Sequence, residues 1–183
     1  MKKNQDIPFS YPVKIGHISA NPVEVRLAAD EEERAGLARL WNVLSVDAFS
    51  AQLQVNRWKK DGVRIKGRVM ANIVQSCVVT LEPVKTKIDE PIDAVFVPEG
   101  SKLARIYTGE DGEMFLDPEG PDAPDVFSGD AIDAGEVAAE HAALAIDPYP
   151  RKPGVAFAGH VESTEKDERK PSPFAVLKDW KKD

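Results

Sequence analysis

The stretch GVRIKGRVMANIV, residues 62–74, alternates apolar and other side chains along its length. Alternation at every second residue is the period of a β-strand that buries one face. We therefore expect a strand that is apolar on one side and cationic on the other. The apolar set is Val63, Ile65, Gly67, Val69, Ala71 and Ile73, and the cationic set is Arg64, Lys66 and Arg68.

The run before this stretch has the same period, with Phe49, Ala51, Leu53 and Val55 at alternate positions. The turn signal Lys60-Asp61-Gly62 separates the two runs, so they are expected to pair as an antiparallel hairpin. A strand with Val23, Val25 and Leu27 should precede them. The apolar run from Val74 to Leu81 should continue the sheet as a buried strand up to Pro83, and residues 88–96 mark a further strand or two.

Two helices are expected. Asp30 followed by Glu33 forms a capping box, and Leu37, Leu40, Trp41 and Leu44 make one apolar stripe, which predicts a helix over Glu31–Leu44. The second helix spans Asp133–Ile146 and ends at the prolines of DPYPRKPG.

These elements predict an α+β fold in which two main helices pack on an antiparallel β-sheet. Whether the sheet stays open or curls toward a barrel is left undecided by the pattern. Residues 1–155 are expected to form one domain with a flexible acidic loop at about 108–131. Residues 156–183 read as a flexible linker and a short C-terminal helical motif, because the sequence there is rich in charge and poor in apolar residues.

The formal net charge of the 183 residues is -7, which argues against wholesale coating of nucleic-acid phosphates. The distribution is uneven, since eight basic and two acidic residues lie between Arg57 and Lys87. Between Glu110 and Glu140 there are eleven acidic residues and no lysine or arginine. We find neither a targeting segment nor a run long enough to span a membrane, so a cytoplasmic protein without membrane contact is expected.

The single cysteine, Cys77, lies in the apolar run QSCVVTLEP, residues 75–83. A catalytic thiolate needs a cationic or helix-terminal setting and a base within reach, whereas the three histidines lie in separate segments. A zinc site needs about four ligands, and one cysteine with scattered histidines does not supply them. The favoured interpretation is a small buried side chain, and no catalytic residue, metal or cofactor is predicted.

The most informative surface is basic. Strand cations could contact phosphates while a tryptophan stacks on an unpaired base. The alternative is an ordinary solvated strand face, or one that the acidic loop covers. The predicted surface for RNA or a partner comprises Arg57, Trp58, Lys59, Arg64, Lys66 and Arg68.

Three stretches, GRVMANIVQSCVVTLEPV (67–84), DAIDAGEVAAEHAALAIDPYPRKPG (130–154) and PSPFAVLKDW (171–180), carry a family resemblance. Over roughly residues 7–180 the chain resembles the bacterial YceD family, and most closely its alphaproteobacterial branch. The resemblance implies a role in accumulation of 23S ribosomal RNA, and hence in ribosome assembly. Many members carry Cys-x-x-Cys where this chain has Cys77 and then Thr80, which puts a metal or redox role in doubt.

The resemblance also marks residues expected to serve turns and packing, namely Cys77, Thr80, Leu81, Glu82, Pro83, Asp147, Pro148, Tyr149 and Pro150. The leading hypothesis is a non-enzymatic factor that binds rRNA or a ribosomal protein. The alternative is an adaptor that recruits or restrains another rRNA-processing factor without touching RNA, through the acidic segment and a tail motif with Phe174 and Leu177. An enzyme would need Cys77 beside a histidine. Oligomeric state is left open.

Overall fold

The computed structural model describes residues 7–18, 22–104 and 123–155. By internal contacts the chain divides into a unit Met1–Pro153 and a unit Gly154–Asp183. The elements described below all belong to the first unit, and the expected tail motif with Phe174 and Leu177 lies outside the described residues.

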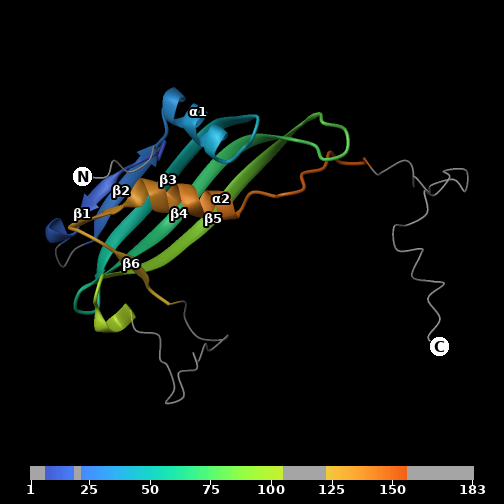
Figure 1. Ribbon diagram of the computed structural model, residues 1–183. Helices are drawn as coiled ribbons and strands as arrows, with labels where there is room; N and C mark the ends of the chain where they lie inside the picture. Colours follow the sequence, from blue (N-terminus) through green and yellow to red (C-terminus); the bar gives the residue numbers. More distant parts are fainter. Residues whose placement is uncertain (1–6, 19–21, 105–122, 156–183) are drawn as a thin grey trace, which may run out of the picture. The chain divides into compact units, whose positions relative to one another are not determined.

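The first unit is built on a five-stranded sheet of order β2-β3-β4-β5-β6, with a separate pair β1-β7. The long strands of this sheet lie next to one another (Figure 1), and among the described strands β5 and β6 alone pair in parallel. The sheet is open rather than closed into a barrel. The strands are β1 Pro12–Lys14, β2 Val23–Ala28, β3 Ser45–Trp58, β4 Gly62–Ser76, β5 Pro83–Pro98, β6 Asp125–Phe127 and β7 Ala131–Asp133; the helices are α1 Glu31–Leu40 and α2 Ala134–Leu144, with 3-10 turns η1 Ile15–His17 and η2 Lys102–Ala104.

The predicted hairpin is confirmed. Phe49 lies opposite Ala71, and Val55 lies opposite Ile65, so the two alternating runs bury the same face. Gly67 is required here by space: a Cβ on it would lie 2.1 Å from the carbonyl oxygen of Gln52. The α+β class and the antiparallel character of the main sheet follow the sequence pattern.

Helix α1 starts as predicted and ends earlier than predicted. The Asp30 side chain accepts from the Glu33 N–H at 2.9 Å, and the Glu33 side chain accepts from the Asp30 N–H at 2.8 Å. The helix stops at Leu40 because the chain turns at Asn42, which has a φ of 53°. Leu44 is therefore outside the helix and exposed, and its N–H donates to the carbonyl of Val74.

Helix α2 covers the apolar face of the sheet with small side chains, and it packs on β4 and β5 (Figure 1). Asp133 caps it by accepting from the N–H groups of Gly135 and Glu136, each at 3.0 Å. Leu37 of α1 and Val137 of α2 belong to one hydrophobic core with the buried residues of β3 and β4. Both helices therefore cover one face and leave the other face of the sheet to solvent.

Two expectations for the segments after β4 need correction. Strand β4 ends at Ser76, so the expected strand through Leu81 is a turn instead. The acidic stretch contains strand β6, whose residue Asp125 pairs with Phe96, although its composition predicted no regular element; residues 105–122 lie outside the described part. Among the described residues, no helix is long and apolar enough to cross a membrane.

Candidate functional site

The predicted cations of β4 project from the solvent face in one row, which we call the strand row: Arg64, Lys66 and Arg68. Strand β5 places carboxylates beside them. Arg64 donates to both oxygens of Asp93, at 2.6 and 2.7 Å, and Lys66 lies 3.4 Å from the same carboxylate. Arg68 pairs with Asp89. The face expected to be cationic is thus a ladder of paired charges.

Electrostatics follow this geometry. The hydrogen bond from Arg64 lowers the pKa of Asp93 below its ordinary value, and the same contact raises the pKa of Arg64. Each pair is nevertheless accessible, since the Arg64 and Asp93 side chains are 38% and 48% exposed. Exposed pairs of this kind contribute little to the stability of a fold, because solvent screens them. A competing anion can therefore replace the carboxylate at small cost.

Of the other three predicted residues, Arg57 and Trp58 end β3 and Lys59 follows in the turn. Trp58 shares the face of the strand row, because it lies two residues beyond Asn56, the cross-strand partner of Arg64. Arg57 lies on the opposite side of β3 from Trp58, and its Nε donates to the carbonyl of Ile18 at 2.8 Å. The ammonium of Lys59 lies 4.2 Å from the centroid of the Trp58 ring. A Cβ on Gly62 would lie 2.7 Å from that ring, so Trp58 already has neighbours at its surface.

A second site lies at the other end of the long strands. We call residues 77–87, with residues 147–152, the hairpin tip; this name includes the turn and the first residues of β5. Two backbone hydrogen bonds close the turn. The Leu81 N–H donates to the carbonyl of Cys77 at 2.9 Å, and the Cys77 N–H donates to the carbonyl of Glu82 at 2.8 Å. Leu81 has a φ of 61°, the left-handed region, which costs a non-glycine residue about 1–2 kcal/mol.

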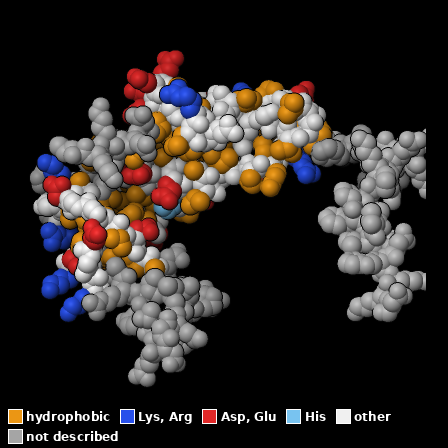
Figure 2. Space-filling model, viewed as in Figure 1, with side chains coloured by type: hydrophobic (Ala, Val, Ile, Leu, Met, Phe, Trp, Pro, Cys, Tyr) orange, Lys and Arg blue, Asp and Glu red, His pale blue; other side chains and the backbone are white. Residues whose placement is uncertain are grey.

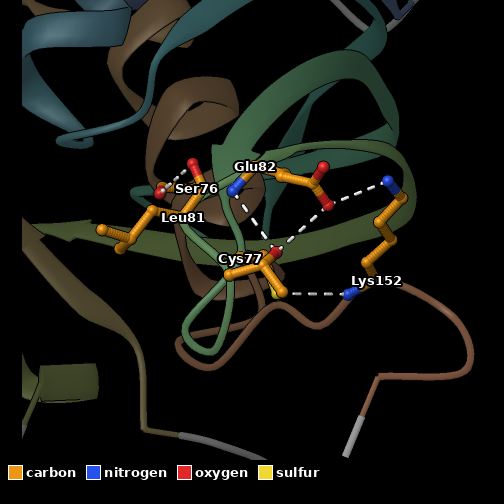
Figure 3. A network of polar contacts seen from close by, with 6 residues as sticks. Ser76, Cys77, Leu81, Glu82 and Lys152 are labelled. Carbon is orange, nitrogen blue, oxygen red and sulfur yellow. Dashed lines mark hydrogen bonds and ion pairs between the residues drawn. The ribbon is translucent and has the colours of Figure 1, made fainter.

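The segment after α2 packs against this turn. The side-chain amide of Gln75 donates to the carbonyl of Asp147 at 2.8 Å, and the Val78 N–H donates to the carbonyl of Pro150 at 2.9 Å. An ion pair also joins the two segments, because the ammonium of Lys152 lies 2.9 Å from the Glu82 carboxylate (Figure 3). The two stretches that the family resemblance marked separately are thus one structural unit. Neither Gln75 nor Lys152 was a predicted site residue, although Lys152 lies within DPYPRKPG.

Cys77 is fully buried at the start of the turn, where its sulfur accepts the Lys152 N–H at 3.5 Å. Its placement on a strand was wrong, whereas its burial was predicted. A hydrogen bond from the Thr80 side chain, and bonds from the backbone of Lys152, Thr80 and Val79, lower the pKa of Cys77 to about 6 although burial opposes the shift. The Thr80 hydroxyl also donates to the Glu82 carboxylate at 3.3 Å.

Three further features bear on a metal site or a catalytic site. In the part of the chain that the structure describes, no three His, Cys, Asp or Glu residues gather to hold a metal ion. His141 of α2 is engaged within its own helix, with Nδ1 2.9 Å from the carbonyl oxygen of Val137. A hollow of about 790 Å³ between α1 and the start of β3 contains none of the predicted site residues.

Comparison with known proteins gives one match. The family model described as "Large ribosomal RNA subunit accumulation protein YceD" matches residues 65–181, a region that includes most of β4 and the whole hairpin tip. No curated protein and no solved structure matches the chain.

Proposed function

Because this chain belongs to the YceD family of large ribosomal RNA subunit accumulation proteins, we propose that it is a non-enzymatic factor that supports accumulation of this RNA by binding to it. The proposal places the protein with assembling ribosomes in the cytoplasm. Direct contact with RNA requires a surface on which cations can reach phosphates.

The observation that carries the proposal is the strand row. Its three cations extend from one face of β4 at alternate positions, about 7 Å apart along the strand. Asp89 and Asp93 hold these side chains in place without burying them. A phosphate of similar charge can take the place of a carboxylate, and the fork of Arg64 fits either anion with two hydrogen bonds.

The test is binding of the full chain to a transcript of the large ribosomal RNA at several salt concentrations. We expect affinity to fall as salt rises, because cations that neutralise phosphates release counterions. Replacing the strand row by glutamine (Arg64→Gln, Lys66→Gln, Arg68→Gln) should weaken binding about two- to fivefold, since each cation already has a carboxylate partner. Lys14→Gln, an exposed cation on β1, is the matched control.

Absence of RNA binding by the wild-type chain, or binding that ignores salt, would overturn the proposal. A variant of the strand row that binds as tightly as the control would remove this surface from it.

A basic ribosomal protein is the second candidate partner. A cluster of carboxylates at Asp133, Glu136 and Glu140 favours it. Burial, Asp133 and Glu140 raise the pKa of Glu136 above its ordinary value. A lysine or arginine from a partner would relieve this repulsion. Identifying what crosslinks to the chain separates the two partners.

A further inference from the structure

Large apolar side chains are exposed together at the hairpin tip. Leu81 is 77% exposed, Tyr149 is 70% exposed and Val78 is 39% exposed. The bond between the Val78 N–H and the carbonyl of Pro150 brings Val78 next to the segment that carries Tyr149. Figure 2 shows hydrophobic atoms at the surface of this end of the described chain, with a basic side chain beside them. Exposed apolar side chains gathered in this way mark an interaction surface.

The backbone that presents these side chains is firmly held. The carbonyl of Leu81 accepts from the Ser76 hydroxyl at 3.2 Å, and the N–H of Leu81 donates to the carbonyl of Cys77. The side chain of Asp147 accepts the Tyr149 N–H at 2.8 Å. Leu81 thus occupies a left-handed position, where glycine would be easier to accommodate, and its side chain points to solvent. Strained residues that their surroundings hold in place cluster at functional sites.

Charge indicates the kind of partner. Lys85, Lys87 and Arg151 are exposed and have no ion pair among the described residues. The carboxylates nearby are engaged: Glu82 pairs with Lys152, which lowers the pKa of Glu82, and Asp147 caps its own turn. Asp89, two residues beyond Lys87 on the same face of β5, pairs with Arg68. The tip therefore combines uncompensated cations with an exposed aromatic ring. That combination is complementary to an anionic chain with flat bases, and it is a poor match for a basic protein.

We propose that the hairpin tip binds unpaired nucleotides of an RNA strand. In this arrangement Tyr149 stacks on a base, Leu81 and Val78 contact the neighbouring nucleotide, and Arg151, Lys85 and Lys87 contact phosphates. Single-stranded RNA is favoured over duplex because the bases of a duplex are already stacked on each other. This inference rests on the RNA contact proposed above and names the form of RNA that is recognised.

The experiment measures fluorescence anisotropy of a labelled oligouridine of about 12 nucleotides, a length that covers one binding module. The full chain is compared with Tyr149→Ala, Tyr149→Phe and the control Tyr11→Ala, which removes a tyrosine that is 48% exposed on another part of the surface. We expect about tenfold weaker binding for Tyr149→Ala, with Tyr149→Phe and Tyr11→Ala close to wild type. An annealed duplex of the same length should bind more weakly than the single strand.

Leu81→Gly separates recognition from folding. Glycine relieves the left-handed strain, so this variant should unfold at a higher denaturant concentration while binding the oligonucleotide more weakly. A purely structural role for Leu81 predicts no loss of binding from a stabilised variant.

Unchanged oligonucleotide binding by both Tyr149→Ala and Leu81→Gly would overturn the inference. If the wild-type chain still binds the large ribosomal RNA and only the strand-row variant loses affinity, the proposed function stands and the tip has no part in it. If the wild type binds neither RNA, both proposals fail. Loss of a protein contact by Tyr149→Ala, with RNA binding unchanged, would assign the tip to a protein partner instead.

Discussion

The strand row presents three basic side chains to solvent and the hairpin tip presents four, but the two surfaces differ in what lies beside those charges. In the strand row, Asp89 and Asp93 stand across from the cations on the next strand. At the tip Lys152 pairs with Glu82, whereas Lys85, Lys87 and Arg151 have no ion pair among the residues that the structure describes. The number of cations on the solvent face of β4 therefore overstates the positive potential of that face, because the neighbouring strand supplies carboxylates.

The largest expected effect comes from removing the charges of the tip. Lys85→Gln, Lys87→Gln and Arg151→Gln in one chain should reduce the slope of log affinity against log salt by about 2, because each lost phosphate contact in single-stranded RNA removes about 0.7. The equivalent strand-row variant should change the slope by less than about 1. When a phosphate displaces an aspartate from its partner, the freed aspartate attracts a cation from solution, which offsets a cation released from the RNA. Anisotropy titrations with oligouridine measure both. Equal slopes for the two variants would erase the distinction between the surfaces.

A smaller effect of opposite sign should follow from freeing the strand row. Asp89→Asn with Asp93→Asn leaves Arg64, Lys66 and Arg68 without their partners. We expect RNA affinity to rise about two- to tenfold and the salt dependence to steepen. Glu24→Gln, which removes an exposed carboxylate of β2, serves as the control. Unaltered affinity after the double replacement would mean that the strand row does not contact RNA.

The smallest effect on binding is expected at Cys77. Cys77→Ser should leave RNA affinity within about twofold of wild type, because the side chain is fully buried and cannot contact RNA. Its effect on stability should depend on pH. The pKa of the thiol is lowered from 9.0 to about 6 in the folded protein, so the stabilisation is complete above about pH 9 and disappears as the pH falls to about 6.

Urea unfolding of wild type and Cys77→Ser at these two pH values, in the presence of reductant, measures this linkage. The wild type should gain stability over the variant as the pH rises. A difference between the two proteins that does not change with pH would show that the hydrogen bonds from Thr80 and Lys152 do not favour the thiolate.

Local patterns predicted the elements of this fold well. The alternation of residues 63–73 gave the buried face of β4, and the capping box at Asp30 gave the start of α1. Helix α1 ended early because Asn42 adopts a left-handed conformation, which composition does not reveal. The turn after Ser76 was missed because Val78 and Val79 have high strand propensity, while the turn is stabilised by long-range bonds to residues 150 and 152.

The site was harder to predict for a related reason. The two-residue period of a strand determines which side chains share a face. It therefore predicted that Arg64, Lys66 and Arg68 lie on one face of β4. Which charges face each other across strands depends on register, and Asp93 lies opposite Lys66 only because of the particular pairing of β4 with β5. The exposure of Leu81 and Tyr149 likewise depends on how the segment after α2 packs on the turn.

The most direct measurement is ultraviolet crosslinking of the full chain in native lysate, with sequencing of the attached RNA and mapping of the attached peptides. The account predicts fragments of large ribosomal RNA joined to peptides that contain residues 147–152 or 77–87, with fewer crosslinks in Tyr149→Ala. Crosslinks to proteins alone would contradict the account. RNA joined to the chain only at the strand row would contradict the role proposed for the hairpin tip.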